Sequence, residues 1–242
     1  MKVGMQLYSL SPMVNGGQWQ EAVKLACAAG IDGLELYSYY DVPALTYRKL
    51  MNEAGVVCCG THNHWAPLRD DLDHVMEYNY VLGNRTIICH YLMEEERGSA
   101  ENYLRVAESL NEIGAKLKRN GFDLLYHNHD FEFKEVFDGK RGMDLLLENT
   151  DPFLVGMELH IGQLPQFQLD IPGYIRGLGR RLKVLHVHAF LDEEHPFDSR
   201  PGVEAAKALD VEWAVLENVY PEGCGVERPR KDVEALRAMI RG

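Results

Sequence analysis

Histidines in this 242-residue sequence gather where its apolar segments end. An imidazole side chain binds metals, forms hydrogen bonds and carries protons near neutral pH. A single histidine in such a place is more often structural than catalytic, but eight of the ten histidines share it, which predicts a common site. These eight are His62, His64, His90, His127, His129, His160, His186 and His188.

A glutamate ends the last apolar run in the same way. Glu217 follows Ala-Val-Leu, and an acidic side chain there is costly to bury unless a charged partner or a metal satisfies it. Three or four such ligands with an open coordination position form a catalytic metal site. The sequence therefore predicts a metal held by His127, His160, His186 and Glu217. His129 is the alternative to His127, because both lie on one face of their run.

Eight short apolar runs alternate with amphipathic stretches along the chain. Such runs are typical of parallel strands that helices cover on both faces. The longest amphipathic stretch starts at Ser99, a helix-capping residue, and ends at Gly121. The predicted strands are Val3–Ser9, Gly33–Ser38, Val56–His62, Thr86–Tyr91, Asp123–His129, Leu154–His160, Leu182–His188 and Trp213–Val219.

Eight strand–helix units in a chain of this length match the (β/α)8 TIM barrel, whose usual size is about 250 residues. The segment Ser9-Leu10-Ser11-Pro12 after the first run lacks the glycine-rich phosphate loop of a doubly wound sheet, the main competing fold. No linker or change of composition divides the chain. We therefore predict an α/β fold with a single TIM-barrel domain over residues 1–242, whose strand ends meet at one mouth.

The net charge and the cysteines limit the partners and the cellular compartment that the protein can have. Acidic residues outnumber basic ones by 37 to 25, and a formal net charge of -12 repels polyanions, so we expect no nucleic-acid partner. The N-terminus lacks the apolar stretch of a signal peptide, and no apolar run reaches the roughly 20 residues of a membrane span. The five cysteines form no CxxC pair. These features predict a soluble cytoplasmic protein with reduced cysteines and no membrane partner.

Six segments of the chain form recognisable motifs: Gly4-Met-Gln-Leu-Tyr-Ser9, Ala28-Ala-Gly-Ile-Asp-Gly-Leu-Glu35, Gly60-Thr-His62, Tyr126-His-Asn-His-Asp-Phe-Glu-Phe133, Leu185-His-Val-His188 and Trp213-Ala-Val-Leu-Glu217. These motifs resemble those of the xylose-isomerase-like TIM-barrel superfamily, which includes sugar-phosphate isomerases, epimerases and endonuclease IV. The resemblance covers nearly the whole chain and implies a divalent metal, a small sugar-like substrate and a homo-oligomer.

Two positions depart from the Glu, Asp, His and Glu that hold the metal in the superfamily. His186 and Glu217 match the last two ligands. His127 stands where the first Glu falls, as in the branch that carries a His-Asn-His motif, and His160 stands where the Asp falls. Nitrogen ligands in place of oxygen favour Zn, Mn or Fe over Mg.

The implied chemistry is the isomerisation or epimerisation of a ketose, a keto-inositol or a related sugar, phosphorylated or not, through an enediolate. A metal stabilises the developing charge, and carboxylates move the proton. Glu217 is expected to serve as both ligand and base, with Glu132 or His188 as the second acid/base. The expected substrate-binding residues are Gln6, Tyr8, Glu35, His62, Trp65, His90 and His129.

Other functions stay open on the sequence. A dehydratase or lyase acting on a keto-sugar or inosose needs the same enediolate and differs only in the leaving group. A barrel that binds a sugar without turnover is the non-enzymatic alternative. Phosphodiester cleavage of the endonuclease IV type needs three metals and a DNA-binding surface, which the net charge disfavours. Glu35 also has an alternative role, as the structural partner of a lysine inside the barrel.

Overall fold

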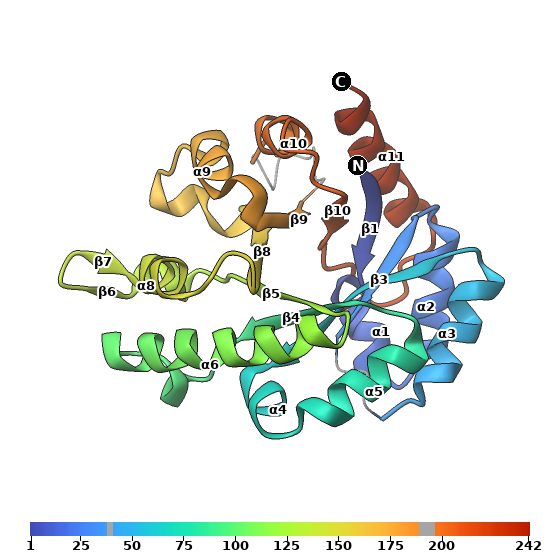
Figure 1. Cartoon of the computed structure of the whole chain (residues 1–242). Coiled ribbons are helices and arrows are strands. Elements are labelled where there is room, and N and C mark those ends of the chain that lie inside the picture. Colours follow the sequence, from blue (N-terminus) through green and yellow to red (C-terminus); the bar gives the residue numbers. More distant parts are fainter. Residues whose placement is uncertain (38–40, 189–196) are drawn as a thin grey trace.

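The computed structural model describes residues 1–37, 41–188 and 197–242. Eight parallel strands close into a barrel in the order β1-β10-β9-β8-β5-β4-β3-β2, and helices surround it (Figure 1). This arrangement confirms the predicted (β/α)8 barrel. Its strands are β1 (Lys2–Gln6), β2 (Gly33–Leu36), β3 (Val57–His64), β4 (Thr86–Tyr91), β5 (Asp123–His127), β8 (Val155–His160), β9 (Leu182–Val187) and β10 (Trp213–Leu216).

The helices pack their apolar stripes on the outside of the barrel. The longest, α6, begins after Ser99, whose Oγ accepts a hydrogen bond from the Asn102 backbone N–H at 3.1 Å, as its sequence predicts. The helices are α1 (Ser11–Asn15), α2 (Trp19–Ala28), α3 (Ala44–Glu53), α4 (Trp65–Asp70), α5 (Leu72–Leu82), α6 (Ala100–Arg119), α7 (Phe131–Lys134), α8 (Gly142–Asn149), α9 (Ile171–Leu178), α10 (Arg200–Lys207) and α11 (Glu227–Arg241).

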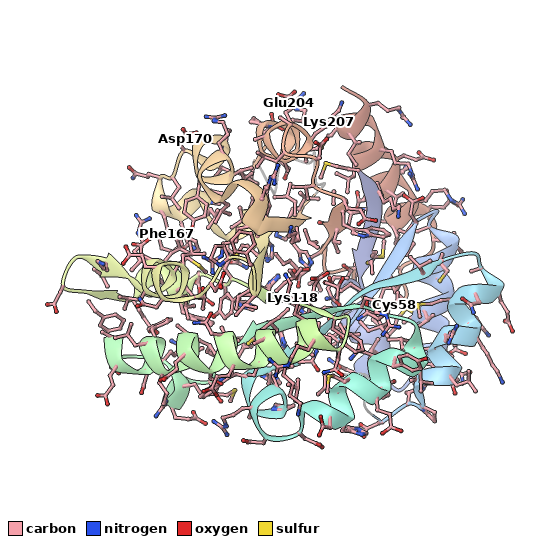
Figure 2. The ribbon with its side chains drawn as sticks, in the orientation of Figure 1. Cys58, Lys118, Phe167, Asp170, Glu204 and Lys207 are labelled. Carbon is pink, nitrogen blue, oxygen red and sulfur yellow. The ribbon has the colours of Figure 1, made fainter. Side chains whose placement is uncertain are left out.

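Shorter elements complete the fold. Single 3-10 turns occur at Leu7–Leu10, Glu94–Glu96, Ile161–Gln163, Pro165–Phe167 and Gly179–Arg181. Figure 2 shows the side chains that fill the space between barrel and helices, with Asp170, Glu204 and Lys207 at the outer edge. Among the described residues, no helix combines the length and the apolar character that a membrane span requires.

Several strands end earlier than the sequence predicts. Strands β5, β9 and β10 stop at His127, Val187 and Leu216, so the residues that follow belong to the loops at the mouth. In contrast, β3 continues past His62 to residue 64, and β2 ends at residue 36, with the predicted strand end at Ser38 outside the described residues. The antiparallel hairpin of β6 (Val136–Phe137) and β7 (Lys140–Arg141) was not predicted, because strands of two residues leave no periodic pattern.

The barrel interior is apolar at one end and polar at the other. A separate apolar cluster lies inside it, made of Cys59, Ile88, Leu125, Val184, Trp213 and Val215. Because side chains alternate between the two faces of a strand, the residue two positions further along points into the same interior. For four members of the cluster this next residue is polar and lies towards the C-terminal end of the strand: His90 after Ile88, His127 after Leu125, His186 after Val184 and Glu217 after Val215.

Candidate active site

A cavity of about 400 Å³ opens at the C-terminal ends of the barrel strands. This is the end at which TIM barrels build their sites. Seven of the predicted site residues line it: Tyr8, His62, His90, His127, His129, His160 and Glu217. Tyr37, His64, Tyr91 and Gln163 complete the lining. The sequence grouped His64 with the other strand-end histidines but gave none of these four residues a specific role.

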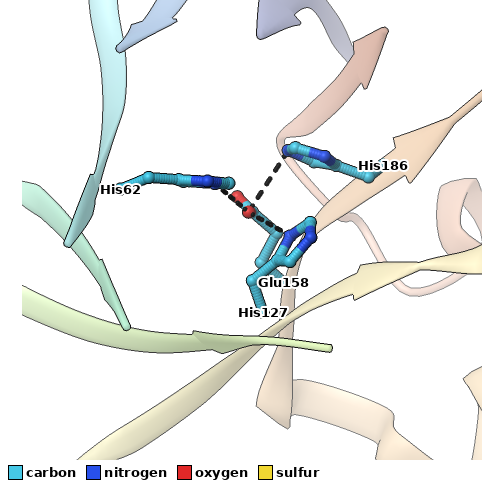
Figure 3. Close-up of side chains that lie close together, drawn as sticks. All are labelled: His62, His127, Glu158 and His186. Atoms are coloured by element: carbon cyan, nitrogen blue, oxygen red, sulfur yellow. Dashed lines mark hydrogen bonds and ion pairs between the residues drawn. The ribbon is translucent and has the colours of Figure 1, made fainter. Parts of the chain in front are cut away.

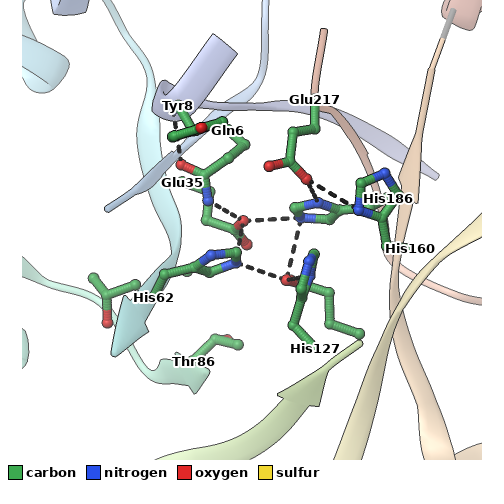
Figure 4. A network of polar contacts seen from close by, with 12 residues as sticks. Gln6, Tyr8, Glu35, His62, Thr86, His127, His160, His186 and Glu217 are labelled. Carbon is green, nitrogen blue, oxygen red and sulfur yellow. Dashed lines mark hydrogen bonds and ion pairs between the residues drawn. The ribbon is translucent and has the colours of Figure 1, made fainter. Parts of the chain in front are cut away.

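The four predicted metal ligands converge beside this cavity. His127, His160, His186 and Glu217 each offer one ligand atom, and these atoms all lie within 4.8 Å of one another. Glu217 Oε2 is 2.9 Å from His186 Nδ1 and 3.3 Å from His160 Nδ1 (Figure 4). Strand pairing positions two of them, because β8 and β9 pair with His160 opposite His186.

A second, deeper cluster lies directly beneath these ligands. Glu158 Oε1 is 2.8 Å from His127 Nδ1, 2.8 Å from His62 Nε2 and 3.2 Å from His186 Nε2 (Figure 3). Glu35 Oε1 lies 2.9 Å from both His62 Nε2 and His186 Nε2 (Figure 4). Both carboxyl groups are completely buried.

Opposite charges hold this inner cluster together. Burial disfavours charge on Glu158, but His186 and His62 lower its pKa well below the usual range. Burial likewise opposes a charged ring at His62 and His186, yet Glu35 and Glu158 raise the pKa of His62 to about 9 and that of His186 well above its usual value. The two carboxylates and the imidazoles therefore stabilise one another inside the barrel.

The inner carboxylates also fix how the ligand rings face the cavity. When the Nδ1–H of His127 donates to Glu158, its Nε2 presents a lone pair on the other side of the ring. When the Nε2–H of His186 donates to Glu35, its Nδ1 lies beside Glu217 and would present a lone pair once a metal displaced its proton. Carboxylates that orient metal-binding histidines in this way are a recurrent feature of metal sites.

The surroundings of the His160 ring indicate whether a metal ion fits among the four candidate ligands. Its Nε2 lies 3.0 Å from His188 Nε2, and its Nδ1 is buried without a hydrogen-bond partner. In the tautomer whose Nε2–H donates to His188, the lone pair of Nδ1 faces Glu217 Oε2 at 3.3 Å, and a cation bound between these two electron donors would stabilise them. Burial also lowers the pKa of His160 well below its usual value, which keeps the ring neutral. The three imidazoles and one carboxylate fit a borderline divalent metal.

His127 and His186 also belong to an alternative group with His62 and Glu158, whose ligand atoms lie equally close. All four residues of that group are buried, whereas Glu217 is partly exposed and lines the cavity. A catalytic metal needs a position open to substrate. We therefore assign the group that contains Glu217 as the candidate metal site and the deeper cluster as its support.

Three predicted substrate-binding residues do not line the cavity. Trp65 is 2% exposed at the start of α4, where its Nε1–H donates to Ser109 Oγ on α6 at 3.1 Å. It therefore packs between helices, outside the cavity lining, and its predicted stacking on a substrate stays a prediction. Gln6 and Glu35 lie below the cavity, joined by a hydrogen bond of 2.7 Å from Gln6 Nε2 to Glu35 Oε1. Glu35 pairs with histidines there, not with a lysine.

Neither residue predicted as the second acid/base faces the cavity. Glu132 is completely buried, with Oε1 accepting from the Tyr126 hydroxyl at 2.7 Å and Oε2 from the His129 N–H at 2.8 Å. It therefore braces the loop after β5. His188 packs against His160 and Gly162, where a Cβ on the glycine would meet the His188 ring at 2.0 Å. Its ring thus positions His160 instead of lining the cavity.

Glu158 is the important residue that the sequence-based prediction left out of the site. It lies two positions before His160 in Met-Glu-Leu-His and on the same strand face, which was the signal available. The histidine nearer the strand end took precedence because active sites form at that end.

Comparisons with known proteins agree with the barrel fold. No curated protein sequence matches the chain. A sugar phosphate isomerase/epimerase from Parabacteroides distasonis superposes with a TM-score of 0.83 at 20% identity, covering 99% of this chain and 94% of that one. D-psicose 3-epimerase superposes with a TM-score of 0.75 at 14% identity over 100% of both chains.

An AP endonuclease of family 2 from Brucella melitensis gives a TM-score of 0.71 at 16% identity, over 92% of this chain and 95% of that one. At these identities the superpositions show the shared fold alone. The family model described as xylose isomerase-like TIM barrel matches residues 23–237, nearly the whole chain. The chain therefore belongs to the xylose isomerase-like TIM-barrel family.

Proposed function

We propose that the chain is a divalent-metal-dependent isomerase or epimerase of a ketose, a keto-inositol or a related polyol. The observation that carries the proposal is the convergence of His127, His160, His186 and Glu217 beside a cavity large enough for a small molecule. The structural neighbours, a sugar phosphate isomerase/epimerase and D-psicose 3-epimerase, support the same kind of reaction.

A bound divalent cation would act as a Lewis acid that stabilises negative charge on neighbouring substrate oxygens. The protein itself moves the proton. Glu217 directs Oε2 towards His160 and His186, which leaves Oε1 to take a proton from the carbon next to a substrate carbonyl. His160 and His186 lower the pKa of Glu217 well below its usual range against the effect of burial, so this carboxylate is ionised in the folded protein.

Isomerisation and epimerisation differ in the number of side chains that must accept or donate a proton. A proton shift between neighbouring carbons needs one base on one face of the substrate, whereas inversion of a carbon needs groups on both faces. Glu217 is the one carboxylate among the described lining residues of the cavity. For inversion, the second group would be one of the imidazoles that line the cavity, such as His129, whose pKa burial and His127 lower to about 3.

Elemental analysis of protein purified without added metal tests the proposal first. We expect about one equivalent of Zn, Mn or Fe in the wild type and its loss in His186→Ala and Glu217→Ala. His74→Ala is the matched control, since His74 lies exposed on α5 away from the barrel interior, and should keep the metal. A wild type that stays empty after divalent metals are supplied contradicts the proposal.

Loaded protein is then incubated with ketoses in deuterated water and followed by proton NMR. An isomerase or epimerase exchanges a carbon-bound proton while the total sugar is conserved. An unsaturated product would instead identify a dehydratase on the same metal site. Binding of a ketose without exchange or product would identify a sugar-binding barrel.

A further inference from the structure

The lining of the cavity matches an uncharged polyol in its chemistry. Rings of histidine and tyrosine form most of the wall, and Gln163 and Glu217 add an amide and a carboxylate. These groups donate and accept hydrogen bonds as hydroxyl groups do. Tyr8, which is 44% exposed, meets Tyr37 edge to face at a ring distance of 5.1 Å and offers an apolar surface to the CH face of a sugar.

No lysine or arginine lines the cavity among the residues that the structure describes. The two segments outside that description, residues 38–40 and 189–196, also contain neither residue type in their sequence. Phosphate groups are usually bound through arginine or lysine, which supply charge-assisted hydrogen bonds. The cationic groups at this end already face carboxylates: His62 pairs with Glu35 and Glu158, and the metal would be held beside Glu217.

Four basic residues of the loops and helix starts that follow the barrel strands already have acidic partners. Arg97 forms an ion pair with Glu135, whose second oxygen accepts from the Gly98 N–H at 3.0 Å. Three more ion pairs are formed by Lys134 with Asp130, Lys140 with Glu148, and Arg200 with Asp198. Recruiting any of these cations to a phosphate would break an existing pair.

We infer that the cavity selects an unphosphorylated ketose or keto-polyol of one sugar unit over the corresponding phosphate ester. This inference rests on the proposed function, because it names the substrate class of the same site. The cavity volume of about 400 Å³ lies at the lower end of the range for small-molecule sites, which suits one sugar unit. Discrimination comes from the lack of a further counter-charge, since a terminal phosphate dianion loses its hydration without gaining a cation that is free of a carboxylate partner.

The test uses matched pairs of free ketoses and their terminal phosphates, such as D-fructose and D-fructose 6-phosphate, on the metal-loaded protein. Binding is measured by thermal stabilisation, and turnover by proton exchange in deuterated water. For the best pair, we expect the free sugar to exceed its phosphate by on the order of 100-fold in affinity and in kcat/KM. Inorganic phosphate should not compete with the free sugar.

A charge-adding variant strengthens the test. Gln163→Arg places a guanidinium in the cavity lining and should shift the preference towards the phosphate ester by about tenfold or more. Gln163→Met, of similar length and without charge, should not shift it. Equal or tighter binding of the phosphate esters by the wild type overturns the inference, and so does failure of every free sugar to bind.

The outcomes separate the inference from the proposed function. Selective binding of free sugars without proton exchange retains the substrate class and rejects the isomerase. Proton exchange that is faster with phosphate esters retains the isomerase and rejects the substrate class.

Discussion

The Nδ1 atom of His127 lies 2.8 Å from Glu158 Oε1, on the side of the ring away from the cavity. The contact joins a candidate metal ligand to a fully buried carboxylate. It fixes both the tautomer and the direction of the imidazole, so that Nε2 is the atom available to a metal. The neighbouring strands β5 and β8 set this relationship, since His127 pairs with Glu158 in their register.

Glu158→Gln is expected to weaken metal binding by roughly 10- to 100-fold, because the amide orients His127 less firmly and removes negative charge. Competition with a chromophoric chelator measures the affinity. Glu148→Gln is the control, since Glu148 is exposed on α8 and pairs with Lys140. Unchanged affinity in Glu158→Gln would show that His127 does not bind the metal through Nε2.

Gly60→Ala should disturb Glu35, the other buried carboxylate that orients the ligand histidines. A Cβ at position 60 would lie 2.6 Å from Glu35 Oε2 and 2.7 Å from Ile88 Cδ1, so both must move. We expect a loss of about 1–3 kcal/mol in the free energy of unfolding and a lower metal affinity, measured by urea denaturation and chelator competition.

Gly177→Ala is the matched control for that change, because a Cβ there meets no atom within 4 Å and the residue lies within α9. It should leave metal affinity unchanged and raise the stability by up to about 1 kcal/mol. Equal effects of the two substitutions would contradict the proposed role of the Gly60 contact.

Glu132 should make the stability fall as the pH rises. Burial raises its pKa from 4.5 to about 7 in the folded protein. Between these values the folded state binds more protons than the unfolded state, so the Glu132 contribution to stability is present at low pH and is lost as the pH rises through about 7.

Urea denaturation at several pH values between 5 and 8 measures this effect. Glu132→Gln should show a flatter dependence, although its absolute stability drops because its amide nitrogen can face the His129 N–H. The slope is therefore the readout. A wild type and variant with parallel pH profiles would mean that Glu132 does not titrate in this range.

Substitutions of Trp65 and Tyr8 should have opposite effects, one on stability alone and the other on KM alone. Trp65→Phe removes the hydrogen bond to Ser109 and is expected to cost about 1 kcal/mol of stability while KM stays unchanged. Tyr8→Ala removes a partly exposed ring from the cavity wall and should raise KM with a stability change within about 0.5 kcal/mol. A raised KM in Trp65→Phe at unchanged stability would support the stacking role that the sequence suggested.

The order of strands and the convergence of the four ligand candidates follow from sequence patterns. Strand-end position places His127, His160, His186 and Glu217 at one mouth whenever a parallel barrel forms. The distance of a side chain below the mouth of the barrel does not follow from its position near a strand end. It depends on strand register and bulges, such as the shift between Met157 and Glu158 in the pairing of β8 with β9.

Two predicted substrate-binding residues lie elsewhere because the sequence does not specify how deep a side chain lies or which way it points. Glu35 was assigned to the substrate, but the pairing of β2 with β1 places it beside Gln6, below the cavity. Trp65 follows the end of β3 directly, yet the start of α4 turns its side chain outward towards α6. Neither side-chain position can be predicted from the local sequence, because both depend on how neighbouring elements pack.

The apolar cluster of Cys59, Ile88, Leu125, Val184, Trp213 and Val215 closes the barrel below the site. Reactant and product must therefore pass through the same opening and bind in turn to one place. Steady-state kinetics should then show product inhibition that is competitive with substrate, and net flux will depend on how fast the product is withdrawn from the surrounding solution.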